Sequence, residues 1–173
     1  MNHRFCSLFF VAVLLFGFVS AQAQERTAIK GYNEFSASVG IGGVVAGLAG
    51  PYPALLYTRG LQFGEYFDAG LCVGYEVGAS AQLTLRAKIP FGDQSRCGFY
   101  LSGNGGASFF AFEGTTPILS GSTGLYWRFK RGSRLYAGPF CTKFYTYAHT
   151  EPKPEYRVKG WGGALGLRVG FQF

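Results

Sequence analysis

Charged side chains are scarce in this sequence, and their scarcity limits the classes of protein to which it can belong. Asp, Glu, Lys and Arg make up 14% of the 173 residues, against roughly 25% in ordinary soluble proteins. The basic residues are scattered singly, so no Lys/Arg block indicates a nucleic-acid-binding arm. A water-soluble domain with so few charges would struggle to hydrate its surface, whereas a protein with a lipid-facing belt would not.

Histidine is also scarce, and the expected mature domain has an odd number of cysteines. Beyond residue 23 the chain has one histidine, His149, and three cysteines, Cys72, Cys97 and Cys141. An odd number excludes a fully paired disulfide framework, and the spacings match no zinc-binding pattern. We therefore expect no cofactor and no metal. We expect the thiols to be small buried groups, with a Cys72–Cys141 disulfide as the alternative if the two meet.

Long hydrophobic runs are absent except at the start of the chain. Residues 5–19 are almost wholly apolar, follow the basic Arg4, and precede an A-x-A cleavage signal at residues 21–23. This run is shorter than the roughly 20 residues that cross a bilayer as a helix. It predicts a cleaved secretory signal peptide over residues 1–23 and a mature domain over residues 24–173. An uncleaved anchor is the alternative.

The chain is instead rich in glycine, in aromatic residues and in two-residue alternation. In residues 163–173 every second position is apolar, and glycine or polar residues lie between. The apolar positions are Leu165, Leu167, Val169, Phe171 and Phe173. Because a strand directs alternate side chains to opposite faces, this segment has one wholly apolar face. Lipid is the simplest solvent for such a face if the pattern repeats.

The pattern does repeat, and it predicts eight strands of roughly ten residues, a length that crosses a membrane with tilt. The expected strands are residues 34–41, 54–63, 67–77, 81–89, 98–111, 119–129, 134–147 and 157–173. An even number of strands places both ends of the chain on the same side of the membrane. Turns 64–66, 91–97 and 130–133 lie on that side too. The other side then carries loops 42–53, 78–79, 112–117 and 148–156.

Two of these strands are irregular. Arg59 falls on the apolar face of the second strand. In the seventh strand we place Tyr136, Phe140 and Phe144 on the apolar face. Pro139 cannot donate to a ladder, and a closed sheet has no free edge for it, so we expect a bulge there.

Alternation alone does not say which face points outward, because a soluble lipocalin-like barrel also has about eight alternating strands. The outer face of a soluble barrel must be hydrated by charges. Here the non-apolar face is mostly Gly, Ser and Thr, too poor in charge for a surface in water. It suits a narrow interior, in which the glycines make room. Those glycines are Gly40, Gly70, Gly74, Gly106, Gly166 and Gly170.

A few charges do fall on this inward face, and they have both signs. They are Glu34, Asp68 and Glu76 on early strands and Arg86, Lys88, Arg128 and Arg168 on later ones. Opposite charges that converge on a small lumen pair and neutralise one another, so we predict a polar plug rather than an open pore.

Aromatic residues gather where strands meet the short turns, which indicates an interfacial girdle on that side. The residues are Phe63, Tyr66, Phe67, Phe91, Phe99, Trp127, Phe129, Phe171 and Phe173. The alternative is that they are ordinary core aromatics of a soluble sandwich.

These features together resemble small bacterial outer-membrane β-barrels, the porin-like, OmpA- or OmpW-type eight-stranded group, in the glycine-rich style common in Bacteroidetes. The resemblance rests on the leader, on residues 65–76 and on the terminal residues 167–173. It implies an all-β, eight-stranded antiparallel up-and-down transmembrane barrel in the outer membrane. It also implies outer-membrane lipids as partners, and an insertion machinery that recognises the C-terminal strand.

For function, the sequence favours a structural, assembly or surface role without catalysis, and two alternatives stay open. A lipid-modifying enzyme needs a nucleophile and a base, and His149 beside Thr150 and Glu151 is the one candidate base. A binding or adhesion barrel would act through loops 42–53 and 148–156. Its outer contacts would be Tyr52, His149, Glu151 and Lys153.

Overall fold

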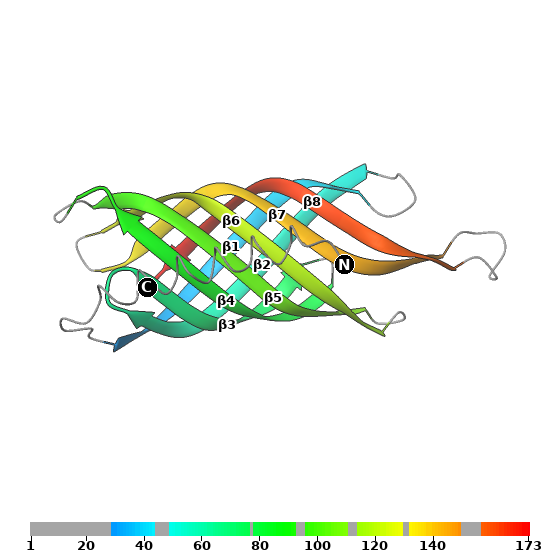
Figure 1. Ribbon diagram of the computed structural model, residues 1–173, viewed down its shortest axis with the longest axis horizontal. Helices are drawn as coiled ribbons and strands as arrows, with labels where there is room; N and C mark the ends of the chain where they lie inside the picture. Colours follow the sequence, from blue (N-terminus) through cyan, green and yellow to red (C-terminus); the bar gives the residue numbers. More distant parts are fainter. Residues whose placement is uncertain are drawn as a thin grey trace, which may run out of the picture.

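The computed structural model describes residues 29–43, 49–76, 78–92, 96–110, 114–129, 132–149 and 157–173. They form eight strands, tilted against the long axis of the molecule (Figure 1). The strands are β1 (Ile29–Gly43), β2 (Ala49–Phe63), β3 (Phe67–Glu76), β4 (Ala79–Pro90), β5 (Cys97–Phe110), β6 (Gly114–Arg128), β7 (Arg134–His149) and β8 (Arg157–Gln172). No helix in the described residues is long and apolar enough to cross a membrane.

The eight strands close into one antiparallel barrel, because β1 pairs with both β2 and β8. The predicted all-β, eight-stranded antiparallel barrel is therefore confirmed. The pairings also fix how far the barrel is sheared. Stepping from Tyr32 around all the strands leads back to β1 at Gly42, ten residues further along. At the usual strand spacing, that offset tilts the strands by about 40° from the barrel axis.

Several strands are longer than the sequence predicted. The β2 strand begins at Ala49, β6 begins at Gly114 and β7 continues to His149. The expected loops 42–53, 112–117 and 148–156 are therefore partly strand. Proline misled the prediction, because Pro51 and Pro53 both lie in β2, where they pair with β1 and face outward.

For the seventh strand, the prediction from sequence turned the wrong face inward. Tyr136, Phe140 and Phe144 are buried inside the barrel rather than on its apolar exterior. The expected bulge at Pro139 is also absent, because β6 and β7 keep the same register on both sides of that residue. The ladder between β6 and β7 is merely interrupted there, while Pro139 stays paired with Leu167 of β8.

In the other strands the two faces lie as the alternation predicted. Large apolar side chains are exposed on the outside, and polar side chains are buried inside. Arg59 of β2 points outward with its apolar neighbours. The two cysteines considered as a disulfide point in opposite directions, Cys72 into the barrel and Cys141 out of it, so they cannot pair. We had expected Cys141 to be buried, but it is exposed.

Candidate functional site: the side-chain plug of the lumen

Two ion pairs close the lumen nearest the short turns. The Arg86 guanidinium donates two hydrogen bonds, of 2.5 and 2.7 Å, to the Glu34 carboxylate. Two residues further along β4, Lys88 Nζ lies 2.5 Å from Asp68 Oδ1, and neither side chain is exposed. Arg86 also approaches Asp68 at 3.8 Å and lies over the Tyr136 ring, 4.0 Å from its centroid. Four charges and an aromatic face thus fill one cross-section.

A second cluster centres on Glu76, which is fully buried in β3. Its Oε1 accepts hydrogen bonds from Arg168 Nη2 at 3.0 Å and from the Thr142 hydroxyl at 2.7 Å. Its Oε2 accepts one from Gln82 Nε2 at 2.9 Å. Arg168 in turn donates from Nε to the Ser38 hydroxyl at 2.7 Å. Four strands, β3, β4, β7 and β8, therefore meet at this carboxylate, and Arg168 connects it to β1 through Ser38.

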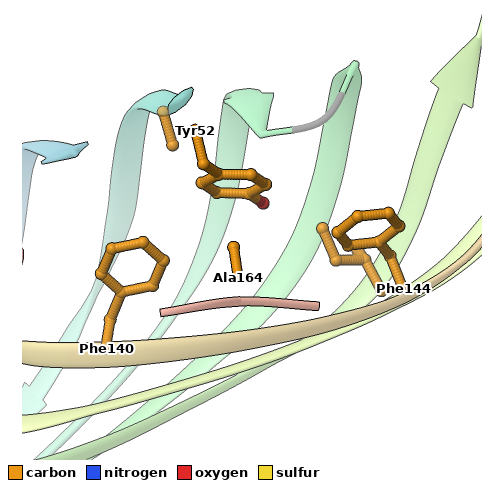
Figure 2. Packing of buried hydrophobic residues seen from close by; sticks show 6 residues of the cluster. Tyr52, Phe140, Phe144 and Ala164 are labelled. Atoms are coloured by element: carbon orange, nitrogen blue, oxygen red, sulfur yellow. The ribbon is translucent and has the colours of Figure 1, made fainter. Parts of the chain in front are cut away.

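At the level of Glu76, on the side of the longer connections, the lumen also holds an apolar cluster. Tyr52, Phe140, Phe144 and Ala164 pack together from β2, β7 and β8 (Figure 2). The Tyr52 ring stacks on Phe144 with centroids 6.3 Å apart and lies 5.9 Å from Phe140. We had predicted a polar plug, but part of the plug is apolar. Tyr52 is also not an outer-loop contact, because its side chain is 6% exposed inside the barrel.

At the short-turn end lies a cation that the sequence analysis overlooked. Arg134 is 5% exposed and donates from Nη1 to the side-chain oxygens of Gln62 and Gln172, at 2.7 and 3.2 Å. Arg128, which we had placed in the lumen network, stands instead at the rim and pairs with Glu65 of the turn. Arg128 has the parity of the inward side chains of β6, and Arg134 has the parity of Tyr136 and Phe140, the face of β7 that the prediction had turned outward.

Among the residues that the structure describes, the charges buried inside the barrel nearly cancel. The buried carboxylates are Glu34, Asp68 and Glu76, and the buried cations are Arg86, Lys88, Arg134 and Arg168. Every one of the three carboxylates has a cation within 3.0 Å. Buried ion pairs add little net stability, because desolvation offsets the attraction, but breaking one is costly. Removing one partner of an ion pair in the lumen is therefore expected to destabilise the barrel.

Glycines opposite the inward aromatics make the packing possible. Tyr32 of β1 lies over Gly60 and Gly70, which pair across β2 and β3. A Cβ built on Gly70 would come within 2.9 Å of the Tyr32 hydroxyl and of the Arg59 carbonyl oxygen. Likewise, a Cβ on Gly166 would come within 2.8 Å of the Phe140 ring. The glycines thus make room for specific rings.

Gly70→Ala is expected to destabilise the barrel by about 1–3 kcal/mol, because Tyr32 and the β2 backbone must shift to admit the methyl group. The measurement is the urea midpoint of the protein in lipid vesicles. Gly31→Ala is the matched control, since nothing lies within 4 Å of a Cβ at that position of β1. Equal midpoints for the two variants would contradict the close packing of Tyr32 on glycine.

On the outer face, the nine predicted girdle residues lie at the short-turn end, half-buried or exposed. Their rings touch in pairs, as in Phe63–Phe67 at 6.0 Å and Phe91–Phe99 at 5.2 Å. Phe173 stacks on both Phe171 and Phe35. Phe35 was not among the predicted girdle residues.

A second aromatic belt, which we had not predicted, lies at the other end. Tyr145 and Trp161 meet edge to face at 5.4 Å, and Lys143 Nζ lies 5.3 Å from the centroid of the Trp161 ring. Trp161 and Phe171 are ten residues apart on β8. At about 3.3 Å per residue and a tilt of about 40°, the two belts stand roughly 25 Å apart along the axis. That is the height of the apolar band of known membrane barrels.

The remaining outer-contact predictions lie at the edge of the described chain. The backbone of His149 ends β7 and pairs with Arg157. Glu151 and Lys153 lie outside the described residues. No group of His, Cys, Asp and Glu that could hold a metal ion occurs in the part of the chain that the structure describes.

Comparison with known proteins supports the fold. No family model and no curated protein matches the sequence. Among solved structures, the barrel is similar to Neisserial surface protein A (NspA), with a TM-score of 0.53 and 15% sequence identity. The alignment covers 84% of this chain and 97% of that one. At this identity the likeness concerns architecture, and it agrees with the closed eight-stranded barrel derived above.

Proposed function

We propose that this chain is an outer-membrane β-barrel that spans the bilayer with a closed lumen and serves a structural, assembly or surface role without catalysis. One observation carries the proposal, namely that the exposure of the two faces is inverted relative to a soluble protein. Leu71 and Leu165 are each 69% exposed on the outside, whereas Asp68 and Glu76 are fully buried inside. Exposed apolar surface on this scale requires a lipid solvent.

The two aromatic belts support this placement. Aromatic side chains favour the two membrane–water interfaces, and here they border an apolar band of the expected height. The strands that enclose the band satisfy one another's backbone groups around a closed barrel, as the interior of a bilayer requires. By analogy with other such barrels, we place the short turns in the periplasm and the longer connections at the cell surface.

Export and assembly follow from the same proposal. A signal peptide over residues 1–23 would deliver the chain across the inner membrane. The C-terminal strand, with Phe171 and Phe173 exposed at its end, would then be recognised by the insertion machinery of the outer membrane. Neisserial surface protein A is described as a surface protein, and we extend that location, without any further activity, to this chain.

The protein isolated from the outer-membrane fraction is expected to migrate differently on a gel before and after boiling, because a folded barrel resists detergent. In planar lipid bilayers it is expected to show no steps of porin size, since the Glu34–Arg86 and Glu76–Arg168 pairs fill the lumen. The controls are a boiled sample and a sample that has been refolded after heat denaturation. Recovery in the soluble periplasmic fraction, or a wide conducting channel, would overturn the proposal.

A further inference from the structure

A cavity of about 440 Å³ lies inside the short-turn end of the barrel. Gln62, Arg134 and Gln172 line its inner part, and Lys30, Glu65 and Arg128 line its mouth. The described side chains do not completely fill this end of the lumen. Its lining is partly polar and partly apolar, and it carries three cations, Lys30, Arg128 and Arg134, against the Glu65 carboxylate and the terminal carboxylate of Phe173.

Arg134 is the charge in this cavity that the plug leaves without compensation. Its guanidinium hydrogen-bonds to the amide oxygens of Gln62 and Gln172, which are neutral. Its Nε has no hydrogen-bond partner, and no carboxylate among the described residues lies within ion-pair distance. A buried cation without an anion is costly in a folded protein. The site therefore favours whatever anion can enter.

The carboxylates close to the cavity are already engaged. Glu65 pairs with Arg128 at the rim. Asp68 accepts a hydrogen bond from Gln172 Nε2 at 3.4 Å, and it forms an ion pair with Lys88. The end of the chain at Phe173 accepts a main-chain hydrogen bond from Asn33 and forms no ion pair with the described cations. The described lining therefore carries one surplus positive charge, and Arg134 is its deeply buried cation without an ion pair.

We propose that this cavity binds an oxyanion of the phosphate type, which enters between the short turns and is held by Arg134 with Lys30 at the mouth. A guanidinium offers a planar set of donors that suits the oxygens of a phosphate group, and charge-assisted hydrogen bonds of this kind are strong. The phosphate could be free in the periplasm or belong to the headgroup of an anionic lipid. This inference goes beyond the structural role above and stands on the geometry of the barrel alone.

The test is an NMR titration of the isotope-labelled, folded protein with inorganic phosphate in zwitterionic vesicles. The Nε–H signal of Arg134 is expected to shift and to saturate, with a dissociation constant on the order of 1 mM. In Arg134→Gln, binding followed at the amides of Gly132 and Ser133 is expected to weaken at least about tenfold. Lys30→Gln, at the exposed mouth, provides a second variant in case Arg134→Gln folds poorly. Arg59→Gln, which changes a cation on the outer face, is expected to leave binding unchanged.

Repeating the spectrum without phosphate, in vesicles that contain an anionic phospholipid, identifies the source of the group. A shift of the Arg134 signal there assigns the site to a lipid headgroup, and a response to inorganic phosphate assigns it to a soluble ligand. A change that does not saturate and that chloride reproduces at equal ionic strength would overturn the proposal, as would an affinity that neither variant alters. Heat-modifiable gel mobility would persist in either case, so failure here would leave the proposed function standing.

Discussion

Glu76→Met is expected to lower the free energy of unfolding by about 3–5 kcal/mol, because it leaves Arg168 buried without its carboxylate. Methionine occupies nearly the volume of glutamate, so the loss reports the unpaired charge rather than a cavity. Gln82 and Thr142 would also lose the acceptor of their hydrogen bonds, at 2.9 and 2.7 Å. The measurement is urea unfolding in lipid vesicles, followed by the fluorescence of Trp127 and Trp161, which are exposed on the outer face.

The control is the double variant Glu76→Met with Arg168→Met, which removes both charges. Replacing a buried ion pair by apolar side chains of similar size is often neutral, so most of the lost stability is expected to return. The coupling between the two positions follows from the double-mutant cycle. If the double variant proves less stable than the single one, Arg168 is held mainly by Ser38 and Phe140, and Glu76 is not the centre of the cluster.

The prediction of the barrel from sequence succeeded where the two faces differ strongly in polarity. In β4, Gln82, Thr84, Arg86 and Lys88 alternate with leucine, alanine and isoleucine, and this contrast fixes which face points inward. In β7 the contrast is reversed, because the inward face holds large rings and the outward face holds Pro139 and Cys141. Hydrophobicity alone therefore selected the wrong face.

A different signal could have corrected β7. Arg134 and Thr142 have the same parity as Tyr136 and Phe140, and both are polar residues that avoid lipid. Charge is thus a better guide to the inward face of a membrane strand than ring size is. The partners within the lumen could not have been predicted, since Arg86 and Glu34 are 52 residues apart and meet only through the ten-residue shear of the barrel.

Leu83→Arg is expected to destabilise the inserted barrel by about 2–4 kcal/mol, or to block insertion. Leu83 is 51% exposed on the outer face of β4. It lies near the middle of the apolar band, because β4 runs from Ala79, opposite Phe109, to Ile89, opposite Phe99. In lipid an arginine there must desolvate or distort the bilayer. On the surface of a water-soluble barrel, the same change would alter stability by no more than about 0.5 kcal/mol.

Phe109→Arg is the matched control, since Phe109 is 48% exposed on the neighbouring strand but lies at the level of the second aromatic belt. An arginine at that level can reach the headgroups, so the expected cost is about 0–1 kcal/mol. Urea unfolding of both variants in the same vesicles gives the comparison. Because the two positions differ in depth, a bilayer around the barrel predicts the larger cost at Leu83. Equal, small effects at both positions would mean that water, not lipid, surrounds the apolar face.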